Sequence, residues 1–238
     1  LSTKDRVAYT SHTMFYPFTI DDCFLSSSQN LFPVEYAIKH KNDLLESGQY
    51  SCKLCDVFLE SGNKLGTTKS NKQLAGFPFS GGVIDAPVQI FEMPQSNRFD
   101  DFIYVAGQDP YKQAKSDTPS LGAFYVFKRR VGIRDPYAYR IVASYVSRPS
   151  SIDQFCRTCE VLQKGYGAIC LMENADQMYE QYLNRKSGMP ASFFLFAGEA
   201  IANKYVKAGS RQNSKLGLYP TPGNQNLLFS CVVDYCWQ

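Results

Sequence analysis

The sequence predicts an α/β domain built on a mixed β-sheet. Residues 102–109 form an apolar run that ends in Asp109 before Pro110, which is the pattern of a strand buried on both faces that stops at a turn. Residues 168–173 repeat this design and end in Glu173, with two further strand patterns and one helix pattern in between. If the two strands pair in parallel, their carboxylates converge at one edge of the sheet, where open α/β sheets bind their ligands.

Composition is typical of a soluble globular protein. Of the 238 residues, 44% are hydrophobic and 20% are charged. The formal charge of +3 is too small to indicate nucleic-acid binding by itself. No run approaches the roughly 18 apolar residues that cross a bilayer. The first residues lack an initiator Met and a signal-peptide pattern, so we expect a cytoplasmic piece of a longer protein.

Elements before residue 102 are short. Residues 1–48 are expected to form a connector with a helix over 34–45, and residues 49–100 a small antiparallel attachment with turns at 61–63 and 80–82 and a strand at 88–91. Nothing matches the phosphate-binding pattern of nucleotide motors. His12 and His40 are the only histidines, which makes a histidine-based triad a poor prediction.

The main sheet is expected to start at residue 102. Three strands in close succession predict an antiparallel meander, and a helix over 151–164 then leads to the strand that carries Glu173. The predicted elements after the first strand are strands at 121–127 and 139–145, the helix at 151–164, a strand at 168–172, a helix at 176–183 and a strand at 193–196. The order is therefore β-β-β-α-β-α-β, with helices flanking the sheet.

Two Cys-x-x-Cys pairs, Cys52/Cys55 and Cys156/Cys159, have the spacing of a four-thiolate zinc site. The second pair lies in the helix pattern at 151–162, where its positions match the apolar face, so buried thiols are the better interpretation. A zinc-organised interaction protein stays an alternative through Cys52 and Cys55.

Four stretches resemble the nuclease domain of the large terminase subunit of tailed bacteriophages, which has a ribonuclease H-like fold. Tyr16-Pro-Phe-Thr-Ile-Asp-Asp-Cys-Phe24 is similar to the segment that links the family's ATPase and nuclease domains. Tyr104-Val-Ala-Gly-Gln-Asp109 and Leu171-Met-Glu173-Asn174 resemble its two metal-binding strands. Gly217-Leu-Tyr-Pro-Thr-Pro222, followed by a helix, is similar to the family's segment after the fifth strand.

The resemblance implies residues 1–48 as a linker after an ATPase domain and residues 49–238 as the nuclease domain. Asp109 and Glu173 would hold one or two Mg²⁺ or Mn²⁺ ions about 4 Å apart and cut double-stranded viral DNA during packaging. The implied partners are DNA, the ATPase domain, the portal and the small terminase subunit, in the host bacterial cytoplasm and without a membrane. The family's third acidic ligand has no match here. Asp234 is a poor candidate because it lies in the helix that precedes the family's position for that ligand.

Basic residues near the first acid are candidates for phosphate contacts, which position DNA without reading its bases. They are Lys112, Lys128, Arg129 and Arg130. A solvated loop is the alternative interpretation of this cluster. For the whole chain, two alternatives stay open: another ribonuclease H-like nuclease of the resolvase or transposase type, and a catalytically incomplete DNA-binding or assembly module.

Overall fold

We describe the protein from a computed structural model of the whole chain. The described residues are 34–47, 51–76, 81–111, 120–129, 139–173, 178–187, 189, 193–195, 216–219 and 221–236. The chain divides into two compact units, one of Cys52–Pro220 and one of Leu1–Ser51 with Thr221–Gln238. The first of these contains the β-sheet.

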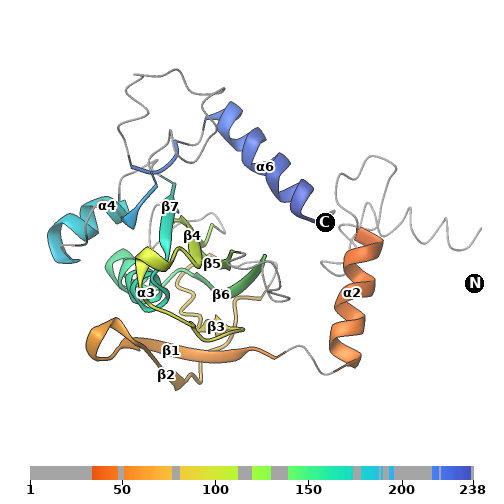
Figure 1. Cartoon of the computed structure of the whole chain (residues 1–238), viewed down its shortest axis with the longest axis horizontal. Coiled ribbons are helices and arrows are strands. Elements are labelled where there is room, and N and C mark those ends of the chain that lie inside the picture. The colour runs from red at the N-terminus through yellow and green to blue at the C-terminus, as the bar shows by residue number, and fades with distance from the viewer. Residues whose placement is uncertain are drawn as a thin grey trace, which may run out of the picture. The chain divides into compact units, whose positions relative to one another are not determined.

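A seven-stranded open sheet is the framework of the larger unit (Figure 1). Its strands are β1 (Lys53–Leu59), β2 (Leu65–Lys69), β3 (Val88–Ile90), β4 (Tyr104–Asp109), β5 (Gly122–Lys128), β6 (Arg140–Ser147) and β7 (Ile169–Met172). Their order across the sheet is β2-β1-β3-β6-β5-β4-β7. All of these neighbours pair antiparallel except β4 and β7, which pair in parallel. The predicted mixed α/β class is confirmed.

The early strands extend the main sheet instead of forming a separate attachment. β3 pairs antiparallel with β6 through Gln89 and Ser144, so β1 and β2 continue the same sheet. The turn expected at 61–63 is a 3-10 turn, η2 (Ser61–Asn63), in which Gly62 and Asn63 adopt positive φ. It connects β1 to β2, a strand that the sequence analysis did not predict.

The predicted meander is confirmed, because β5 pairs with both β4 and β6. The prediction that the first strand is buried on both faces is wrong. Tyr104 and Ala106 are buried, whereas Gly107 and Asp109 are exposed. The strand also begins later than expected: the short helix η3 (Phe99–Asp101) precedes it, and Phe102 ends that helix in the left-handed conformation.

Helix α3 (Ile152–Tyr166) connects β6 to β7 and covers one face of the sheet (Figure 1). Ser151 is its N-cap, although the side chain makes no capping hydrogen bond. Gly167 ends the helix at φ +59°, where an added Cβ would lie 2.5 Å from the backbone of Asn97. Both the conformation and the close approach therefore require glycine.

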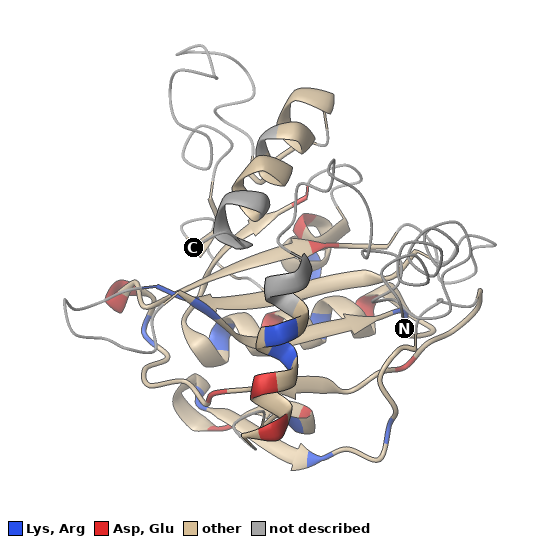
Figure 2. Ribbon diagram, turned by 90° about the vertical axis from the view of Figure 1, so that its right-hand side faces the viewer, with Lys and Arg blue, Asp and Glu red and all other residues tan. Residues whose placement is uncertain are grey.

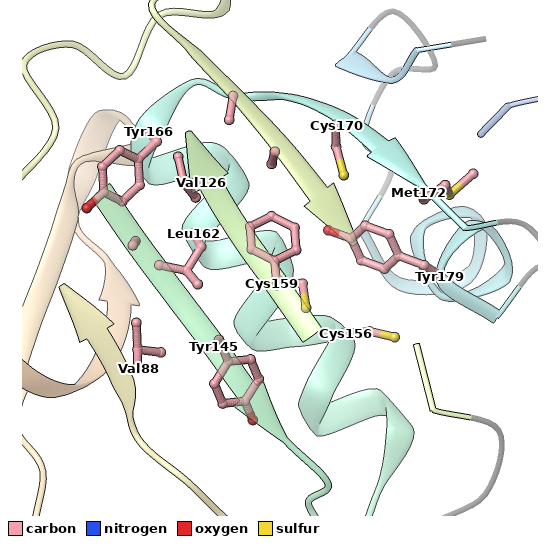
Figure 3. Close-up of a cluster of buried hydrophobic side chains, with 14 of the residues drawn as sticks. Val88, Val126, Tyr145, Cys156, Cys159, Leu162, Tyr166, Cys170, Met172 and Tyr179 are labelled. Carbon is pink, nitrogen blue, oxygen red and sulfur yellow. The ribbon is translucent and has the colours of Figure 1, made fainter. Parts of the chain in front are cut away.

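The hydrophobic core fills the space between α3 and the sheet (Figure 3). Phe124 and Val126 of β5 and Leu162 of α3 are fully buried there. Cys156 and Cys159 are also fully buried, as predicted, and burial raises the pKa of both thiols. They are small core residues and not reactive groups.

A charged cluster closes the core at the start of β4. Glu92 accepts a hydrogen bond from Lys128 at 2.9 Å and also binds Arg140, and its backbone oxygen accepts one from the Tyr166 hydroxyl at 2.6 Å. Burial alone would raise the pKa of Glu92, but the two cations lower it below its ordinary value of 4.5. Because the side chain of Lys128 is 1% exposed, this ion pair is part of the core's structure.

The chain after β7 packs on α3 through a polar bridge. Gln163 donates from its amide to the Phe193 carbonyl at 3.0 Å and accepts from the Tyr179 hydroxyl at 3.0 Å. Tyr179 belongs to α4 (Met178–Tyr182), which runs into the π-helical turn η4 (Leu183–Ser187). Of the strand predicted at 193–196, residues 193–195 are described, and only Phe194 among them forms a bridge, an isolated parallel one to Cys170.

The described residues of the smaller unit include the helices α2 (Val34–Glu46) and α6 (Pro222–Cys236). The helix expected over 34–45 is confirmed, and so is a helix after residue 221. Among the described residues, no helix is long and apolar enough to cross a membrane. Acidic and basic positions are both spread over the described elements (Figure 2).

Candidate active site

The register of β4 and β7 brings the two predicted acids together. Gln108 is the parallel partner of Met172, and the backbone N–H of Glu173 donates to the Gln108 carbonyl at 2.7 Å. Asp109 and Glu173 are the next residues on the two strands, and neighbouring strands lie roughly 4.8 Å apart. The predicted convergence of the strand ends is confirmed.

Both acids lie on the face of the sheet opposite α3. Gln108 is 4% exposed and Met172 1% exposed, because both side chains face the core. Successive side chains on a strand point to opposite faces, so Asp109 and Glu173 point away from the core. Asp109 is exposed and Glu173 half-buried.

A further segment fixes the chain on the other side of Glu173. Leu218 bridges Glu173 in parallel, and its N–H donates to the Met172 carbonyl at 2.8 Å. Gly217 has φ +73°, and an added Cβ would lie 2.3 Å from that same carbonyl oxygen. The motif Gly217-Leu-Tyr-Pro-Thr-Pro222 therefore starts beside the second acid, with a glycine that the close approach requires.

Two of the neighbours of Asp109 on its own face are small. Its partner across the antiparallel ladder is Ala123, and Gly107, two residues earlier on β4, is partnered by Tyr125. The ring of Tyr125 is 40% exposed. The sequence analysis missed this group, although Gly107 and Asp109 share a face in any strand that runs through both.

Two of the predicted phosphate contacts, Lys128 and Arg129, lie away from the acids. Because β5 runs antiparallel to β4, Lys128 is the partner of Tyr104, roughly 17 Å along the strand from Asp109. Lys128 donates a hydrogen bond to Glu92. Arg129, the next residue, is exposed and donates to the Phe102 carbonyl at 3.4 Å. The contacts of Lys128 favour a structural role, and a DNA contact by Arg129 stays a prediction.

Several predicted residues lie outside the description. Lys112, Arg130 and Asn174 are not among the described residues, and neither is the linker-like stretch at 16–24. Asp234 lies in α6, but its side chain is not described.

The donor set of the site suits a hard divalent cation. Two carboxylates side by side offer the oxygen ligands that Mg²⁺ and Mn²⁺ prefer. Within the described ranges no group of three or more His, Cys, Asp or Glu side chains could hold a metal, so the acids stand there as a pair.

The predicted zinc alternative gains no support from the part of the chain that is described. Cys55 is buried in β1, and burial raises the pKa of its thiol. Cys52 accepts a weak hydrogen bond from Gln89 at 3.8 Å. The burial of Cys55 favours a packing role for its side chain, and zinc binding by Cys52 and Cys55 stays a prediction.

Comparison with protein-family models, with curated proteins and with solved structures gave no match. The interpretation of the site therefore depends on its geometry and on the residues that form it.

Proposed function

We propose that this chain is a metal-dependent DNA endonuclease domain with a ribonuclease H-like fold, of the kind found in the large terminase subunit of tailed bacteriophages. One observation carries the proposal: the parallel register of β4 and β7 sets Asp109 beside Glu173 on one face of the sheet, away from the core.

The order of the elements supports the ribonuclease H-like part of the proposal. The chain runs through β4, β5, β6, α3, β7 and α4 to the bridge at Phe194, which is the expected order β-β-β-α-β-α-β. The first and fourth of these strands are the parallel neighbours that end on acids. The segment that starts at Gly217 lies beside the second acid and leads into α6, as the terminase resemblance implies.

Asp109 and Glu173 would hold the cation. Two adjacent carboxylates repel each other, which a divalent cation between them relieves. When bound, such a cation supplies an activated water and stabilises the leaving oxygen of a phosphodiester. The chain's own contribution is to fix the spacing of the acids through the β4–β7 ladder and to leave Asp109 accessible to a large substrate.

The larger assembly belongs to the same proposal. The substrate would be concatemeric double-stranded viral DNA, cut during genome packaging in the host cytoplasm. The partners would be an ATPase domain of the same protein, the portal and the small terminase subunit.

Cleavage of supercoiled plasmid tests the proposal. We expect nicking and linearisation with Mn²⁺ or Mg²⁺, none with EDTA, and background levels for Asp109→Ala and for Glu173→Ala. Asp100→Ala is a matched control, because Asp100 is an exposed acid just before the opposite end of β4. Metal-dependent cleavage that survives both site substitutions would overturn the proposed site.

A second candidate is a DNA-binding or assembly module that keeps the fold and lacks a complete metal site. The observation that favours it is the absence of a third ligand among the described acids. Under this alternative the chain binds duplex DNA and never cleaves it, whichever metal is supplied.

A further inference from the structure

Gly107 lies in the middle of β4, where glycine is normally unfavourable. Glycine loses more conformational freedom on folding than any other residue and contributes no side chain to the sheet. Only Gly62, Gly82, Gly167 and Gly217 among the described glycines have positive φ, so the backbone of Gly107 accepts any L-residue. Its conformation therefore does not explain why glycine is present.

Packing does not explain Gly107 either. A Cβ added at Gly107 would meet no described atom within 4 Å. The strand glycines on β2 and β5 differ: at Gly66 the Cβ would lie 2.3 Å from the ring of Phe58, and at Gly122 2.6 Å from the ring of Phe155. Those two make room for the chain's own side chains, whereas Gly107 leaves open space.

This open space adjoins the acidic pair. Gly107 is two residues before Asp109 on the same face, about 7 Å away along the strand. Ala123, the cross-strand partner of Asp109, adds only a methyl group. Gly107 lies between its partners on the two neighbouring strands, the exposed Tyr125 of β5 and the half-buried Leu171 of β7.

We propose that Gly107 and Ala123 form the floor, and Tyr125 the side wall, of a subsite that receives the sugar-phosphate backbone of one DNA strand beside Asp109 and Glu173. The inference rests on the proposed function and deepens it by naming where the substrate lies. A glycine in a strand interior often marks such a close approach of a ligand or another backbone.

The chemistry of Tyr125 fits a backbone ligand. A tyrosine hydroxyl is protonated at neutral pH and can donate to a phosphate oxygen, and burial raises the pKa of Tyr125 further. Its ring offers a flat apolar surface to a deoxyribose or a base. Neither contact reads sequence, so the subsite positions any DNA strand.

The test measures DNA binding and stability, not cleavage. The probe is a fluorescent duplex oligonucleotide, with Ca²⁺ as the cation, and the variants are Gly107→Val and Tyr125→Ala. Gly76→Val is the matched control, since Gly76 is exposed, lies outside the strands and also has open space around its Cβ. Thermal unfolding is followed for all four proteins, including the wild type.

We expect Gly107→Val to weaken DNA binding by about tenfold or more, which is about 1.4 kcal/mol, with the melting temperature unchanged or raised because valine favours strands. Tyr125→Ala should also weaken binding, and Gly76→Val should not.

Unchanged binding by Gly107→Val overturns the subsite. A marked fall in its melting temperature also overturns it, because the space would then be filled by the chain itself. A wild-type chain that binds no DNA overturns the proposed function and the subsite together, whereas binding without cleavage leaves the subsite standing.

Discussion

The two faces of the sheet at β4 and β5 are built from alternate residues of the same strands, yet they differ in almost every respect. Toward α3, Phe124 and Val126 are fully buried and packed against an aromatic cluster in which Phe155 stacks on Tyr145. On the opposite face, the intervening positions hold Gly107, Asp109 and the exposed ring of Tyr125.

The two faces are therefore expected to have different roles, one in stability and the other in the proposed function. The covered face removes apolar surface from water, which is the main source of stability. The opposite face carries the acids and small residues beside them, which contribute little to packing. Mutations on the first face should therefore act on stability, and mutations on the second on the proposed DNA binding and cleavage.

The largest expected difference in stability is between substitutions of two aromatic residues, Phe155 of α3, which packs on the covered face, and Tyr125 on the opposite face. Phe155→Ala should lower the free energy of unfolding by about 3–5 kcal/mol, because it leaves a cavity in the core. Tyr125→Ala should cost less than about 1 kcal/mol, as expected for a side chain outside the core. Urea unfolding followed by circular dichroism measures both. Equal costs would show that the chain packs both faces.

A charged group on the covered face gives the next effect. Glu92→Gln should cost about 3 kcal/mol at neutral pH, because it removes the charge that compensates the buried ammonium of Lys128. Since the folded protein lowers the pKa of Glu92 below 4.5, its contribution is complete above that value and is lost as the pH falls through the lowered pKa.

The pH dependence provides the control for this prediction. The stability difference between wild type and Glu92→Gln should be constant from pH 7 to about 5 and shrink at lower pH. Thermal unfolding at a series of pH values measures it. A difference that does not change down to pH 3 would contradict the role given to the Glu92 carboxylate.

Two glycines on neighbouring strands give a matched comparison of smaller size. Gly122→Ala should destabilise the protein by about 1–3 kcal/mol, because its methyl would overlap the rings of Phe155 and Tyr111. Gly107→Ala should instead be neutral or stabilising by up to about 1 kcal/mol. Chemical denaturation of both variants measures the change in the free energy of unfolding. A change of the same sign in both variants would contradict the difference between the two faces.

The smallest effect concerns the thiols and involves no substitution. Cys156, Cys159 and Cys170 are fully buried and have pKa values raised by burial, so they should resist alkylation in the folded protein at pH 8. Of the described thiols, Cys231 is the exposed one and should react before the others. Mass spectrometry after a short iodoacetamide treatment, with and without urea, measures this. Early labelling of Cys159 would mean that the core opens readily.

The sequence identified the strands that carry the acids because each apolar run ends abruptly on a carboxylate. It did not identify β2, since Leu65 is the only large apolar residue in that strand and the pairing with β1 decides its conformation. It also placed Lys128 and Arg129 beside the acids because they are near Asp109 in the chain. The predicted meander already implied that these two basic residues lie far from Asp109, because an antiparallel β5 ends beside the start of β4.

The position of the two acids in the chain bears on the stage of folding at which they come together. β4, β5 and β6 pair with neighbours in the chain, whereas β4 and β7 are separated in the chain by β5, β6 and α3. Contacts between distant parts of a chain carry a larger loop-closure entropy and tend to form late in folding. We therefore expect the two carboxylates to come together near the end of folding, so that a partly folded chain carries the separate acids without the site that would cut DNA.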